Sequence, residues 1–223
     1  MLNIPNAITV SRILLVPVFA ILFAVPGAPA RIAAFVIFCI AGASDALDGL
    51  AARKLNAGSD FGRMLDPIAD KILVAVALMM LVSEGNFQQL TLDSAHGLRS
   101  LLKLVPALVI LSREILVSGL REFLAGAAVS VPVTRVAKTK TAIQMIAIGA
   151  MILDPLAWRW LPEGVATTYS LVAYVGLWVA AALTVGTGYA YFRVGIRHLH
   201  PRAERARQRR AELHSRRHAG EAV

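Results

Sequence analysis

The sequence predicts an all-α integral membrane protein with about six transmembrane helices joined by short loops. Of its 223 residues, 57% are hydrophobic and 17% are charged, whereas about a quarter of a soluble domain is charged. Several apolar runs also reach the roughly 20 residues that a helix needs to cross a bilayer. These runs are 8–25, 32–55, 64–83, 101–125, 136–156 and 168–192.

The first apolar run resembles a signal peptide because Ala28-Pro29-Ala30 looks like a cleavage site. No basic segment precedes the run, however, and its one early charge, Arg12, lies inside it. We therefore expect this run to remain as the first membrane helix. The single cysteine, Cys39, excludes an intrachain disulfide, and we expect it to be a small buried apolar residue.

Basic residues alternate between the two sides of the predicted bundle. The first, third and fifth connections contain few, namely Arg31, Arg99 and Arg159, whereas the other connections and the end of the chain are rich in them. The positive-inside rule then places both termini in the cytoplasm and the helices in the cell membrane.

The chain divides into a transmembrane domain, 1–195, and a basic cytoplasmic tail, 196–223. Between Arg202 and Arg217 the tail is rich in arginine but has no aromatic residue on which a base could stack. We expect no nucleic-acid partner, and we expect anionic membrane lipids to attract the tail. The pattern does not decide whether the tail is helical.

Four aspartates lie near the cytoplasmic ends of the second and third runs: Asp45, Asp48, Asp66 and Asp70. Their spacings, i,i+3 and i,i+4, put each pair on one helical face. The short polar connection 56–63 makes the two helices antiparallel neighbours, so both pairs lie at similar depth. Charges inside membrane spans are costly and usually functional.

Four converging carboxylates repel one another, and a bound divalent cation relieves that repulsion. Oxygen donors without histidine favour Mg²⁺ or Mn²⁺ over zinc. The structural alternative is a set of helix-end aspartates paired with Arg53, Arg63 and Lys71. The small residues Gly49, Ala52 and Gly62 near the aspartates allow close approach of either a ligand or a neighbouring helix.

A second polar cluster is predicted from Arg113-Glu114 and Arg121-Glu122 in the fourth run, followed by Lys138 and Lys140. Arginine and lysine side chains are suited to bind phosphate, although basic residues near membrane ends also reach out to the interface. Glu114 and Arg121 are two turns apart, so we expect their partners on other helices or on a ligand. A metal site beside a cationic pocket predicts two phosphorylated substrates.

The pattern Asp45-x₂-Asp48-Gly49-x₂-Ala52-Arg53-x₈-Gly62-x₃-Asp66-x₃-Asp70 resembles the signature of the CDP-alcohol phosphatidyltransferase family at every fixed position. This resemblance implies six transmembrane helices, a homodimer and two metal ions that hold the pyrophosphate of CDP-diacylglycerol. It implies Asp45, Asp48 and Asp66 as metal ligands, with Asp70 near the metals as ligand and general base. The implied contacts of the CDP-lipid are Asp48, Gly49, Ala52, Arg53, Gly62, Asn6 and Thr9.

The opening segment 3–12 and the stretches 112–122 and 138–145 are similar to those of phosphatidylglycerophosphate synthases within this family, with Ala137 in place of their usual glycine. This similarity implies glycerol 3-phosphate as acceptor, with phosphatidylglycerophosphate and CMP as products. The implied contacts of the acceptor phosphate are Arg113, Arg121, Lys138 and Lys140.

Other acceptors remain open within the family: inositol phosphate, serine and phosphatidylglycerol. A cation or proton transporter is a different interpretation, but it predicts acidic residues spread through the depth of the bilayer. A metal-binding scaffold without catalysis is a third.

Overall fold

The computed structural model describes residues 4–55, 60–84, 95–126 and 135–220, and this part of the chain contains helices but no strands. It confirms the predicted all-α class with six helices. They are α1 (Ile4–Ala24), α2 (Ala28–Leu55), α3 (Asp60–Ser83), α4 (Ala95–Gly126), α5 (Arg135–Trp160) and α6 (Glu163–Gly220).

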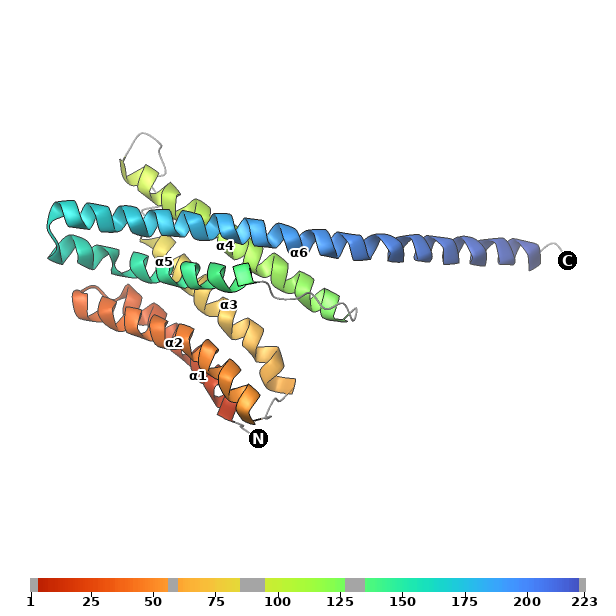
Figure 1. Cartoon of the computed structure of the whole chain (residues 1–223), viewed down its shortest axis with the longest axis horizontal. Helices are drawn as coiled ribbons and strands as arrows, with labels where there is room; N and C mark the ends of the chain where they lie inside the picture. The colour runs from red at the N-terminus through yellow and green to blue at the C-terminus, as the bar shows by residue number, and fades with distance from the viewer. Residues whose placement is uncertain (1–3, 56–59, 85–94, 127–134, 221–223) are drawn as a thin grey trace.

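Helix α6 differs most from the prediction because it does not end where its apolar run ends. It comprises 58 residues, a length of about 87 Å at 1.5 Å per residue. The basic tail, whose conformation the sequence left open, is therefore helical as far as Gly220. Figure 1 shows this end of α6 extending beyond the other helices.

The helices pack as two hairpins with two further helices between them (Figure 1). α5 and α6 form one hairpin, α1 and α2 form the other, and α3 and α4 contact each other and connect the two. Fully buried side chains from five helices meet in the core: Phe19, Phe38, Leu78, Ile148 and Leu177.

Close helix contacts depend on small residues, as in many membrane proteins. A Cβ atom added to Gly149 would lie 3.1 Å from Cε2 of Phe35, and one added to Gly176 would lie 3.4 Å from Cβ of Ala147. Glycine at these positions lets α5 approach its neighbours on both sides.

The outer surface is apolar where that of a soluble protein would be polar. Leu116 and Ile146 are each 72% exposed and Val172 is 66% exposed, whereas the charged residues Arg12 and Lys140 are 1% and 4% exposed. Burial normally runs the other way in water. This distribution suits a protein whose outer face contacts lipid.

Within the described residues, two segments are long and apolar enough to cross a membrane, Thr139–Trp160 and Glu163–Arg193. Three shorter apolar helical segments accompany them: Thr9–Ala24, Ala28–Ser44 and Lys71–Ser83. The expectation for Cys39 was wrong, because this thiol is exposed on the outer surface of α2. A thiol is apolar enough to face the same environment as the exposed leucines.

Candidate functional site

The four aspartates lie on regular helix at matching distances from one end of the bundle. Asp45 is ten residues before the end of α2, and Asp70 is ten residues after the start of α3. Asp48 and Asp66 lie seven and six residues from the same two ends. α2 and α3 contact each other and are joined by only four residues, 56–59. The backbone therefore places both pairs at one level, as the sequence predicted.

The side chains of these aspartates lie outside the part of the chain that the structure describes, as do those of several predicted ligand-binding residues: Asn6, Gly49, Ala52, Arg53, Gly62 and Lys138. Their helices are described, but their contacts are not. Among the side chains that are described, no group of three or more histidine, cysteine or acidic residues could hold a metal. The assignment of the metal ligands remains a prediction.

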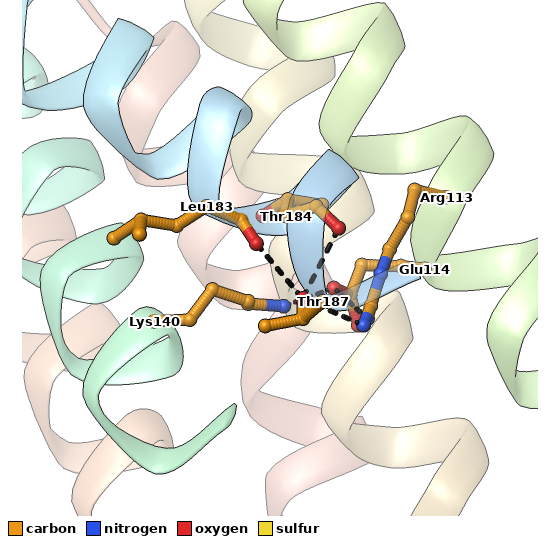
Figure 2. Close-up of polar contacts among 6 residues, drawn as sticks. All are labelled: Arg113, Glu114, Lys140, Leu183, Thr184 and Thr187. Atoms are coloured by element: carbon orange, nitrogen blue, oxygen red, sulfur yellow. Dashed lines mark hydrogen bonds and ion pairs between the residues drawn. The ribbon is translucent and has the colours of Figure 1, made fainter. Parts of the chain in front are cut away.

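Two of the predicted phosphate-binding residues, Arg113 of α4 and Lys140 of α5, meet in a polar cluster, drawn in Figure 2. Glu114 accepts a hydrogen bond from Nη1 of Arg113 at 3.1 Å and forms an ion pair with Nζ of Lys140. Nη2 of Arg113 donates to the hydroxyl of Thr187 in α6 at 3.0 Å. The expectation that Glu114 finds a partner on another helix is confirmed by Lys140. Arg113, for which no such expectation was made, also reaches another helix through Thr187.

Arg113 lies close against α6 at Gly188, where the absence of a side chain gives it room. A Cβ atom on Gly188 would lie 3.0 Å from Cγ and 3.1 Å from Nε of Arg113. The neighbouring Thr187 hydroxyl donates to the carbonyl of Leu183, one turn earlier, at 2.9 Å and accepts from Arg113. Gly188 and Thr187 together fix the arginine in place.

A cavity of about 110 Å³ opens between α3 and α4 beside this cluster. Arg113 and Arg121, both predicted as phosphate contacts, line it. The other lining residues are Lys71, Glu114, Val117, Ser118 and Glu122. The structure thus brings Arg113 and Arg121 to one space and connects Lys140 to it through Glu114.

Lys71 was missed as a ligand-binding candidate, because the sequence presented it only as a possible ion-pair partner of the aspartates. It follows Asp70 directly in α3 and lines the cavity. One residue that lines the cavity is therefore the direct sequence neighbour of the predicted general base, Asp70. Thr184 and Thr187 were missed too, and their i,i+3 spacing inside an apolar run was the available signal.

Three buried polar atoms at this end of the bundle have no hydrogen-bond partner among the described residues. They are Nε of Arg113, Oε1 of Gln144 and Oγ1 of Thr184. Gln144 lies one turn after Lys140 in α5, and Thr184 lies one turn before Thr187 and Gly188 in α6. Buried polar atoms are rarely left unsatisfied, so this region is suited to receive a polar ligand or water.

Arg12 is a second buried cation that the sequence analysis noted but did not assign to the site. It is 1% exposed, and its Nε donates to Oγ of Ser44 at 3.2 Å. Ser44 directly precedes Asp45, so a guanidinium group from α1 reaches α2 beside the first aspartate. Thr9, predicted to contact the CDP-lipid, lies one turn before Arg12 and is also buried.

The chain belongs to the CDP-alcohol phosphatidyltransferase family, whose profile matches residues 2–186. Within this family it is similar to proteins named CDP-diacylglycerol–glycerol-3-phosphate 3-phosphatidyltransferase. The relative from Rickettsia typhi is 42% identical over 194 residues, which cover 86% of this chain and 97% of the relative. The relative from Pseudomonas fluorescens is 40% identical over 201 residues, covering 89% and 92%. The relative from Shigella flexneri is 35% identical over 194 residues, covering 85% and 92%.

Proposed function

We propose that this transferase moves the phosphatidyl group of CDP-diacylglycerol to glycerol 3-phosphate, giving phosphatidylglycerophosphate and CMP. The names of its relatives support both substrates. The observation that carries the proposal is the cationic cavity one residue from Asp70, where an acceptor phosphate and its hydroxyl would lie beside the general base.

The charge of the cavity fits a phosphate monoester. Three cations line it, Lys71, Arg113 and Arg121, and Lys140 adjoins it through Glu114. Arginine and lysine are the side chains suited to bind a phosphate group. This cationic lining favours glycerol 3-phosphate over serine, which carries no phosphate. Lys138, in the first turn of α5, is proposed as a further phosphate contact.

The aspartates fit two Mg²⁺ or Mn²⁺ ions, because four carboxylates at one level of two contacting helices form an oxygen-only donor set. Asp45, Asp48, Asp66 and Asp70 would hold the ions, which when bound neutralise pyrophosphate oxygens and the departing CMP. Asp70 also takes the proton of the attacking hydroxyl. The new bond joins the alcohol oxygen to the lipid-side phosphorus as the pyrophosphate bond to CMP breaks.

The CDP-lipid is proposed to lie along α1, α2 and the start of α3. Its contacts there would be Asn6, Thr9, Asp48, Gly49, Ala52, Arg53 and Gly62. The buried Arg12–Ser44 hydrogen bond supports this arrangement because it joins α1 to α2 directly beside Asp45. Arg12 would act by positioning α2, without contacting the substrate.

The exposed apolar surface and the two long apolar segments support a place in the cell membrane. We extend this to six spans with both termini cytoplasmic, to a domain over 1–195, and to a basic tail that attracts anionic lipids. A homodimer follows from the family resemblance alone.

The test follows CMP release from CDP-diacylglycerol by the purified chain in detergent, with separate acceptors. We expect release with glycerol 3-phosphate, and not with serine, inositol phosphate or phosphatidylglycerol. EDTA should abolish it, and excess Mg²⁺ should restore it. Asp70→Asn should lower kcat by about 10²–10⁴-fold, the usual contribution of general acid–base catalysis.

Release with a different acceptor would keep the reaction type and refute glycerol 3-phosphate. Full activity in EDTA would refute the metal site. No release with any acceptor, from protein that unfolds cooperatively, would refute the catalytic function and favour a scaffold or transporter.

A further inference from the structure

A second cavity lies at the opposite end of the bundle from the acceptor site. Its volume is about 360 Å³, within the range of about 300–1,000 Å³ typical of ligand sites. It is bounded by the end of α1, the start of α2, the end of α3 and the last turns of α5. Phe23, Arg31, Glu84, Pro155 and Arg159 are among its lining residues.

Arg31 is held firmly in this cavity, yet one of its nitrogens has no partner. Nη2 pairs with Glu84, and the guanidinium carbon lies 4.0 Å from the centre of the Phe23 ring, a cation–π contact. Nη1 is buried without a hydrogen-bond partner among the described residues. Four buried polar atoms among the described residues have no hydrogen-bond partner. The other three belong to Arg113, Gln144 and Thr184, at the acceptor end of the bundle. A buried donor of this kind is costly unless a ligand or water satisfies it.

The electrostatics of the cavity favour an anion. Arg31 and Arg159 are two of the three basic residues that the sequence places on this side, and both line the one cavity. Glu84 offsets one of these charges. The start of α2 adds the partial positive charge of a helix N-terminus, reached through a turn at Gly27, whose φ of 122° favours glycine.

Apolar and aromatic side chains surround the same end of the bundle. Trp158, Trp160 and Leu161 are 43%, 58% and 42% exposed, and Val25, at the cavity, is 47% exposed. Exposed tryptophans are typical of the level at which lipid headgroups meet acyl chains. A ligand at this cavity would therefore have its phosphate beside the arginines and its hydrocarbon against these side chains.

We infer that this cavity binds the phosphodiester headgroup of an anionic phospholipid from the leaflet opposite to the aspartates. Arg159 and Nη1 of Arg31 donate to the phosphate, and the net charge of one matches one phosphodiester. This site takes no part in the proposed reaction. Of the proposed function, the inference relies only on the location in a membrane.

Native mass spectrometry of the full chain in detergent tests the inference, with phosphatidylglycerol, phosphatidylcholine and inorganic phosphate as probes. We expect phosphatidylglycerol to be retained in preference to phosphatidylcholine. Arg159→Ala removes a charged hydrogen bond from an exposed residue and should weaken retention about tenfold. The double variant Arg31→Gln, Glu84→Gln keeps the charge balanced and should weaken it similarly. Arg193→Ala is the matched control, since this exposed arginine of α6 does not line the cavity and its loss should change nothing.

Equal retention of phosphatidylglycerol by the wild-type chain and by Arg159→Ala would overturn the inference. So would equal retention of phosphatidylcholine, or displacement of the lipid by inorganic phosphate, which would mark a site for free anions. CMP release should be unchanged in Arg159→Ala. Because lipid retention is measured without turnover, it can be judged even if the proposed reaction fails.

Discussion

The α5–α6 hairpin is bonded differently at its outer end, next to the turn between the helices, and at its inner end, near Lys140 and Thr187. Hydrogen bonds run directly between α5 and α6 at the outer end, whereas at the inner end both helices bond to α4. At the outer end, Ser170 donates to Asp154, Trp158 donates to Oγ of Ser170 at 2.8 Å, and Tyr169 donates to the carbonyl of Ala150 at 2.9 Å. At the inner end, two cations share the carboxylate of Glu114, and three buried polar atoms nearby have no partner among the described residues. Polar contacts that only stabilise are completed within the protein, whereas those of a binding site leave donors and acceptors for the ligand.

The largest effect in this comparison is expected from Glu114→Ala at the inner end. The carboxylate is 16% exposed and is shared by Arg113 and Lys140, and removing one partner of a buried ion pair costs about 3 kcal/mol or more. Thermal unfolding in detergent measures the loss. A double-mutant cycle with Lys140→Met isolates the pair, because losses that simply add would show that Glu114 and Lys140 do not interact.

A smaller effect, on binding alone, is expected from Arg121→Ala. This residue is exposed and lines the acceptor cavity, so its loss should raise KM for glycerol 3-phosphate about tenfold while the fold is retained. KM for CDP-diacylglycerol should not change. Arg193→Ala, an exposed arginine outside the cavity lining, is the matched control. An unchanged dependence on glycerol 3-phosphate in Arg121→Ala would contradict the assignment of this cavity to the acceptor.

The smallest effect is expected at the outer end, from Ser170→Ala. The change removes a hydroxyl that donates to Asp154 and accepts from Trp158, and each of these two hydrogen bonds contributes about 1 kcal/mol to stability. A modest fall in Tm with unchanged kcat and KM would agree with a purely structural role for the Ser170 hydroxyl. A loss of activity without a loss of stability would show that the two ends are coupled.

Much of the fold could be predicted because each helix leaves a mark in local sequence. Apolar runs of bilayer length identified the six helices, and the spacing of the aspartates fixed their faces and their common level. The extent of α6 could not be predicted from hydropathy, because the apolar run stops near Phe192. The helix itself continues to Gly220 through residues such as Ala, Arg, Glu and Gln, which favour helix but are not apolar enough to mark a membrane span. Hydropathy reports the solvent around a helix and not where the helix ends.

The candidate site was predictable in its composition but not in its pairing. Arg113 and Lys140 stood out as cations in or beside apolar runs, whereas their contacts join residues far apart in the chain. Arg113 reaches Thr187, 74 positions away, and Glu114 reaches Lys140, 26 positions away. The space that Gly188 leaves for Arg113 exists only once α4 and α6 are packed. Pairings of this kind depend on helix orientation, which a single sequence does not specify.

The length of α6 has a consequence for how its charge acts at a distance. Beyond Arg193 the helix continues for 27 residues, as far as Gly220, about 40 Å at 1.5 Å per residue. This is several times the Debye length of about 8 Å at physiological ionic strength. A straight helix standing upright on the membrane would hold its last arginines beyond the reach of lipid charge. Pro201, which lies in this helix, has no N–H to bond the carbonyl of Arg197 and therefore weakens the helix at that point. The proposed attraction of the tail to anionic lipid would therefore depend on the angle of α6 at Pro201, and added salt should weaken it most when the helix is bent toward the lipid.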